Sequence, residues 1–128
     1  MIVLLDTHAF IWWNQGGSSL SPRAREVIED PDSTVLFSAV SAYEIALKFA
    51  RGSLELPTDA ALYVPERLSR HGFDILPMTL DHALRAGALP VIHRDPFDRL
   101  LIAQAQVEAI PIITVDPAIG QYDVEVIW

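Results

Sequence analysis

The amino-acid sequence predicts an α/β fold in which a central parallel sheet of four or five strands is flanked by helices. The first reason is a set of short apolar runs with the length of buried strands. They are IVLL at 2–5, TVLFS at 34–38, FDILP at 73–77, IPIITV at 110–115 and VEVIW at 124–128. The second reason is that helical patterns lie between these runs, an alternation typical of parallel strands joined by helical crossovers.

The helical segments between the runs are recognised by apolar residues at helical spacing and by capping residues. They are HAFIWWN from 8, PRAREVIED from 22, AYEIALKFARG from 42, DAALYVPERLSRHG from 59, LDHALRAG from 80 and a helix from Pro96. Ser21 is the expected N-cap of the second helix. Pro65 lies inside the fourth and is expected to kink it or to divide it into two.

Length, charge and cysteine content exclude several classes of function. The 128 residues, 51% of them hydrophobic, are expected to form one domain over 1–128. A net charge of -8 argues against a general basic surface for nucleic acid, so such a partner would be bound locally or through metal ions. The absence of cysteine excludes disulfides, zinc–thiolate sites and thiol catalysis. The apolar runs are too short for a signal peptide or a membrane span, so we expect a soluble, cytoplasmic protein.

The stretch HRDPFDRLL carries two aspartates at the start of the sixth helix. Asp95 is the expected N-cap, and Pro96 suits the first helical position. Asp98 lies in the first turn, where negative charge also suits the helix dipole, so its role is open between helix stabilisation and metal binding. The residues on its helical face are all apolar: Leu101, Ile102 and Ala105. The carboxylate of Asp98 is therefore expected to point inward.

Three further acids are expected at the same edge of the sheet. Asp6 and Asp116 follow the first and fourth apolar runs, and Glu44 lies near the start of the third helix. Carboxyl ends of parallel strands share one edge, so Asp6, Glu44, Asp98 and Asp116 are predicted to converge there. Alone, Glu44 is better explained by a capping box with Ser41, and Asp116 by a turn. Together, oxygen-only ligands predict a catalytic site for Mg²⁺ or Mn²⁺.

The histidines and tryptophans give weaker indications. His8, His71, His82 and His93 show no metal-ligand spacing, although His8 and His93 lie close to the acids in the sequence. Trp12 and Trp13 belong to a helix that is apolar almost all round, which indicates core packing more than a partner surface.

With these residues assembled, the sequence resembles the PIN-domain ribonucleases, and within them the VapC toxins of type II toxin–antitoxin systems. The resemblance covers essentially the whole chain. It is carried by IVLLDTHAFIWW, SAVSAYEIALKFARGSLELP, ALPVIHRDPFDRLLIAQA and PIITVD. It implies a PIN-like fold with the family's catalytic and metal-binding acids at Asp6, Glu44, Asp98 and Asp116.

The resemblance also implies an activity and partners. It implies a Mg²⁺- or Mn²⁺-dependent endoribonuclease that cleaves RNA with metal-activated water and leaves a 5′-phosphate and a 3′-hydroxyl. Members usually form homodimers and are inhibited by a VapB antitoxin whose C-terminal tail covers the acidic pocket, with the Trp12 and Trp13 region a candidate for the antitoxin groove or dimer interface. By the same resemblance, Asp95, Thr7 and Thr114 are possible supporting residues, and Lys48 could balance the charge of Glu44.

Three alternatives remain beside this interpretation. A phosphatase with a nucleophilic aspartate at position 6 usually needs a second acid two residues later, where this chain has His8. A receiver-like signalling domain needs a phosphoacceptor after the third strand, where Met78 stands. An inactive PIN fold that serves only as a binding module is disfavoured by the full set of four acids.

Overall fold

Five parallel strands form the centre of the molecule, which the computed structural model describes over residues 1–128. The strands are β1 (Ile2–Leu5), β2 (Thr34–Ser38), β3 (Asp74–Leu76), β4 (Ile112–Ile113) and β5 (Val126–Ile127). Their order in the sheet is β3-β2-β1-β4-β5, and every neighbouring pair is parallel. The predicted α/β class with a parallel sheet is therefore confirmed.

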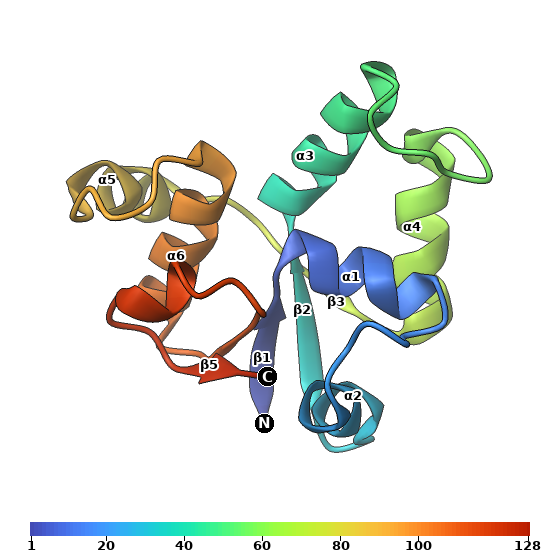
Figure 1. Ribbon diagram of the computed structural model, residues 1–128, viewed down its shortest axis with the longest axis horizontal. Coiled ribbons are helices and arrows are strands. Elements are labelled where there is room, and N and C mark those ends of the chain that lie inside the picture. The colour runs from blue at the N-terminus through green and yellow to red at the C-terminus, as the bar shows by residue number, and fades with distance from the viewer.

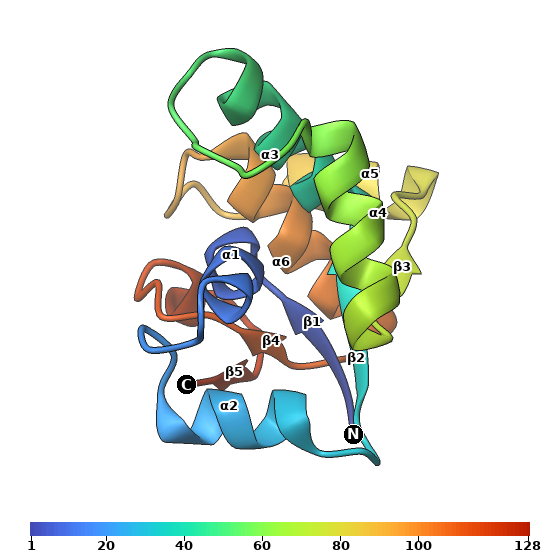
Figure 2. The ribbon, with the colours of Figure 1, turned by 90° about the vertical axis from the view of Figure 1, so that its right-hand side faces the viewer.

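Six helices and one short 3₁₀ turn surround the sheet. They are α1 (Thr7–Asn14), α2 (Pro22–Glu29), α3 (Ala39–Ala50), α4 (Ala60–His71), α5 (Leu80–Ala88), α6 (Pro96–Glu108) and η1 (Ile119–Gln121). Helices α1, α3 and α4 lie to one side of β1 and β2, and α5 and α6 lie to the other (Figure 1). Helix α2 lies near the amino ends of the strands, at the opposite end of the molecule from α3 (Figure 2). None of the helices has the length and hydropathy needed to cross a membrane.

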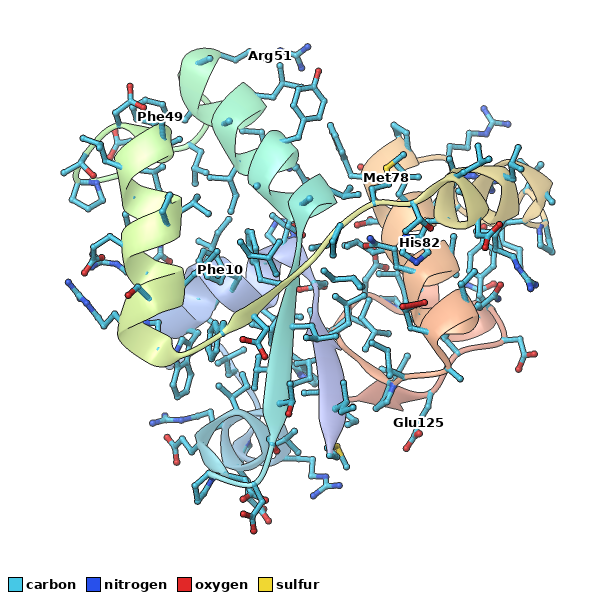
Figure 3. The ribbon with its side chains drawn as sticks, turned by 180° about the vertical axis from the view of Figure 1, so that it is seen from behind. Phe10, Phe49, Arg51, Met78, His82 and Glu125 are labelled. Atoms are coloured by element: carbon cyan, nitrogen blue, oxygen red, sulfur yellow. The ribbon has the colours of Figure 1, made fainter.

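Alternate residues of β1 divide the core into two layers. Val3 and Leu5 belong to the cluster on which α1, α2 and α4 pack, whereas Leu4 belongs to the cluster under α6. In the first layer Phe10 of α1 contacts Phe37, with 4.4 Å between ring centroids, and lies between α1 and α4 (Figure 3). Both faces of the sheet are thus covered, which leaves its carboxyl edge as the place for a polar site.

Three strands are shorter than predicted: β5 covers only Val126–Ile127 of the expected 124–128, and prolines flank the other two, β3 and β4. Strand β3 ends before Pro77, and β4 begins after Pro111, instead of covering 73–77 and 110–115. Proline has no N–H to donate to the ladder. Strand β4 also ends at Ile113, before the end of the apolar run, so Asp116 follows it by three residues and not immediately, as had been expected.

The start of α3 differs from the prediction. The helix begins at Ala39, three residues earlier than expected, because the Ser38 hydroxyl at the end of β2 accepts the Val40 N–H at 3.0 Å and caps it. The predicted capping box of Ser41 with Glu44 is therefore wrong. The Ser41 hydroxyl instead lies 2.8 Å from that of Thr7, and Glu44 lies in the second turn.

Helix α4 continues through Pro65, so the predicted division is wrong. Proline removes only its own N–H from the helix, and its ring lies on the exposed side. The buried residues of this helix, Tyr63, Val64 and Leu68 among them, hold the segment against the core.

Candidate metal centre

Asp6 lies where β1 passes into α1, and it has both a capping role and a buried position. Its Oδ1 accepts the Ala9 N–H at 2.7 Å, which makes it the N-cap of α1. Burial raises the pKa of Asp6, although hydrogen bonds from the Thr114 hydroxyl and the Ala9 N–H oppose the shift. The charge of Asp116 also raises this pKa.

Glu44 points from α3 toward the same edge and is held at both oxygens. The Thr7 hydroxyl donates to Oε1 at 2.7 Å, and the Lys48 ammonium lies 2.6 Å from Oε2. Thr7 follows Asp6 directly, so the contact ties the start of α1 to α3. The contact with Lys48 agrees with the helical spacing of four residues, and it neutralises a carboxylate that is almost wholly buried.

Asp98 lies in the first turn of α6, whose start follows the prediction. Oδ1 of Asp95 accepts the N–H groups of Phe97 and Asp98 at 2.8 and 3.0 Å, so Asp95 is the N-cap. Burial raises the pKa of Asp98 to about 6, against a hydrogen bond from His93 that lowers it, and the charges of Asp95 and Glu44 raise it further. The positive charge near Asp98 therefore does not offset the burial and the neighbouring negative charges that disfavour its ionised form.

Asp116 has the turn role that its position before Pro117 had suggested. Its Oδ1 accepts the Ala118 N–H at 2.9 Å, and its own N–H donates to the Thr114 hydroxyl at 3.1 Å, so it organises the turn after β4. The other oxygen, Oδ2, lies 3.4 Å from Nε2 of His93. The turn fixes one carboxylate oxygen and leaves the second for a ligand.

His93 joins these acids, although its sequence position gave only a weak indication. Its Nε2 lies 2.7 Å from Oδ2 of Asp98. Ligand atoms of His93, Asp98 and Asp116 all lie within 4.8 Å of one another, the grouping expected of a metal site. The available signal was the position of His93 five residues before Asp98, but the loop that turns it back could not be foreseen.

Of the four predicted acids, the structure brings Asp98 and Asp116 into one group with His93, and Asp6 and Glu44 lie outside that group. The charge of Asp116 raises the pKa of Asp6, the charge of Glu44 raises the pKa of Asp98, and Lys48 forms an ion pair with Glu44. Asp98 and Asp116 share the imidazole of His93. Burial raises the pKa of Asp6 and of Asp98, and carboxylate oxygens of this kind suit a hard divalent cation, so the donor set fits such an ion.

Comparison with known proteins gives the chain a family. The family model of the PIN domain matches residues 3–125. Ribonuclease VapC16 of Mycobacterium tuberculosis is 41% identical over 59 residues, which cover 46% of this chain and 40% of that protein. The matched region thus spans less than half of the length of this curated relative.

Solved structures share the fold at low sequence identity. VapBC2 from Rickettsia felis, bound to a promoter DNA fragment, superposes with a TM-score of 0.73 at 15% identity, over 98% of this chain and 97% of that one. FitAcB from Neisseria gonorrhoeae superposes with a TM-score of 0.62 at 23% identity, over 97% of this chain and 95% of that one. The resemblance seen in the sequence thus agrees with the matched model and with the fold, and the chain belongs to the PIN domain family.

Proposed function

We propose that this chain is the toxin of a VapBC-type toxin–antitoxin system and acts as a Mg²⁺- or Mn²⁺-dependent endoribonuclease. The observation that carries the proposal is the grouping of Asp98 and Asp116 with His93 in a chain of the PIN domain family. Asp6 and Glu44 join them in the proposal because the charge of Asp116 acts on Asp6 and that of Glu44 acts on Asp98. The relative named as a ribonuclease supports the activity.

The proposed roles of the acids follow from their contacts. Asp98 and Asp116, whose Oδ2 atoms both lie near Nε2 of His93, are the proposed principal ligands, and Asp6 is the third. Thr7 and Lys48 orient Glu44, the fourth proposed ligand. A divalent ion supplies activation of water for attack at phosphorus and neutralisation of the charge that develops there. The acids, by holding such ions, also let a chain of net charge -8 accept a phosphodiester.

The proposed partners are a VapB-type antitoxin, an RNA substrate and a second copy of the chain. The solved structures of similar fold include VapBC complexes from Rickettsia felis and Salmonella typhimurium, which supports an antitoxin partner. An arginine in an antitoxin tail would compete with a cation for the paired carboxylates of the acidic site.

The proposal is tested by mapping RNA ends. Total RNA is incubated with the purified chain in EDTA, Mg²⁺ or Mn²⁺, and the new 5′ ends are sequenced with and without a 5′-phosphate requirement. We expect new 5′-phosphate ends only when one of the two metals is present. Cleavage that continues in EDTA, or ends without a 5′-phosphate, would contradict the mechanism, and no cleavage with either metal would favour an inactive binding module.

A second measurement concerns stability. Millimolar Mg²⁺ or Mn²⁺ should raise the melting temperature, because binding to the folded state alone stabilises it by about 2.7 kcal/mol at a ligand concentration one hundred times Kd. The control is KCl at equal ionic strength, which screens the acids without binding between them. Equal melting temperatures in KCl and in the divalent salts would count against a metal centre.

A further inference from the structure

We propose that His93 is itself a ligand of the divalent cation, through Nε2, so that the site has a mixed nitrogen and oxygen donor set. This inference rests on the proposed function, since it concerns the cation that the acids are proposed to hold. The ring of His93 lies beside two of those acids in the structure.

The distances around His93 suit a ligand position. Nε2 lies 2.7 Å from Oδ2 of Asp98 and 3.4 Å from Oδ2 of Asp116. Adjacent ligand atoms of an octahedral ion with bonds of about 2.1 Å are about 3 Å apart. The ring nitrogen therefore stands where a third ligand of the same ion belongs, and His93, Asp98 and Asp116 form the grouping within 4.8 Å.

The loop that carries His93 is fixed by groups other than the acids. The hydroxyl of Tyr122 accepts the N–H of His93 at 2.8 Å, and the guanidinium of Arg99 donates to the His93 carbonyl at 3.2 Å. The same guanidinium donates to three further carbonyls of this region, those of Ala86, Leu89 and Pro90. The backbone beneath the ring is thus held in place by α6 and by the segment after η1, which is how a preorganised ligand is supported.

The alternative is that Nε2 keeps its proton and donates to Asp98 from outside the coordination shell. In that arrangement the cation would contact oxygen atoms alone. The two arrangements differ in metal preference, because imidazole nitrogen favours Mn²⁺ and later first-row ions relative to Mg²⁺, whereas carboxylate oxygens suit both. A His93 ligand therefore predicts that Mn²⁺ binds more tightly than Mg²⁺.

The test is pulsed EPR of the full chain with one equivalent of Mn²⁺, which detects nitrogen bound directly to the ion. The variant is His93→Gln, whose amide reaches a similar position but offers oxygen. The matched control is His8→Gln, which removes the histidine whose charge acts on Asp6. Because the His93 side chain is 23% exposed and the loop is held through its backbone, the variant should fold.

We expect nitrogen coupling in the parent and in His8→Gln, and its loss in His93→Gln. The ratio of Mn²⁺ to Mg²⁺ affinity, measured by calorimetry, should fall at least about tenfold in His93→Gln. Tight Mn²⁺ binding without nitrogen coupling in the parent would overturn the inference and leave the proposed nuclease standing. Coupling that survives in His93→Gln would also overturn it, and failure to bind Mn²⁺ at all would overturn both proposals.

Discussion

Asp98→Asn is expected to reduce metal-dependent RNA cleavage by at least about 100-fold while making the folded protein more stable at pH 7. The loss of activity follows because a neutral amide is a poor ligand for a hard cation. The helix start is not affected, since Asp95 and not Asp98 accepts the first N–H groups of α6. The amide oxygen can still accept the hydrogen bond from His93, now at 2.7 Å from Asp98.

The gain in stability follows from the pKa of Asp98. Burial raises it to about 6 from 3.8, so the folded state holds this proton more tightly than the unfolded state. The resulting stabilisation is complete below about pH 4 and is lost as the pH rises through 6. Asparagine has no charge to desolvate, so the variant should exceed the parent by on the order of 1 kcal/mol at pH 7, allowing for solvent screening. At pH 4 the two proteins should be equal.

Thermal unfolding of both proteins in EDTA from pH 4 to 8, beside RNA cleavage assays with Mg²⁺ and Mn²⁺, measures the two effects. Asp95→Asn is the matched control, because asparagine is as good an N-cap as aspartate and Asp95 is not a proposed ligand. It should cleave RNA nearly as well as the parent. Undiminished cleavage by Asp98→Asn would remove this residue from the site, and a stability difference that does not change with pH would contradict the raised pKa.

The positions of two acids could be foreseen because local rules determine them. Asp6 ends a buried strand, and Asp98 shares a helical face with Leu101 and Ile102, so both directions follow from strand and helix periodicity. Glu44 was placed on the correct helix with the wrong start. Its inward direction did not depend on that start, because Glu44 shares a helical face with the buried Val40 and Ser41, four and three residues before it.

His93 could not be placed in this way. Its ring reaches Asp98 because Arg99 and Tyr122 hold the loop before α6, and Tyr122 lies 29 residues away in the sequence. No local pattern encodes a contact of this length. The ends of β3 and β4 were also predicted wrongly, because the predicted strands included Pro77 and Pro111. An apolar run does not show which of its residues must donate an N–H to a neighbouring strand, and proline cannot do so.

Lys48→Met is expected to lower the stability of the metal-free protein by about 1–3 kcal/mol, because it leaves the carboxylate of Glu44 buried without its positive partner. The Glu44 side chain is 4% exposed, whereas that of Lys48 is 38% exposed. Water already screens the ammonium, so the loss should be smaller than for a fully buried pair. Methionine keeps much of the apolar stem, which isolates the effect of charge.

Two further variants separate charge from packing. Glu44→Gln combined with Lys48→Met removes both charges and should recover most of the lost stability, since no ionised group then remains buried. Arg70→Met breaks the i,i+4 pair of Arg70 with Glu66, whose 2.6 Å distance equals that of Lys48 and Glu44. The side chains of Arg70 and Glu66 are both about half exposed. Its effect should be within about 0.5 kcal/mol. Chemical denaturation in EDTA gives all of these values.

The response of Lys48→Met to metal connects this ion pair to the proposed site. If Glu44 is a ligand, a bound cation supplies the positive charge that the variant lacks, so saturating Mg²⁺ should raise the melting temperature of Lys48→Met more than that of the parent. An equal rise in both proteins would mean that Glu44 does not contact the cation and acts only by tying α3 to Thr7. Lys48 would then be a structural partner of Glu44, and the proposed metal ligands would be reduced to the three aspartates with His93.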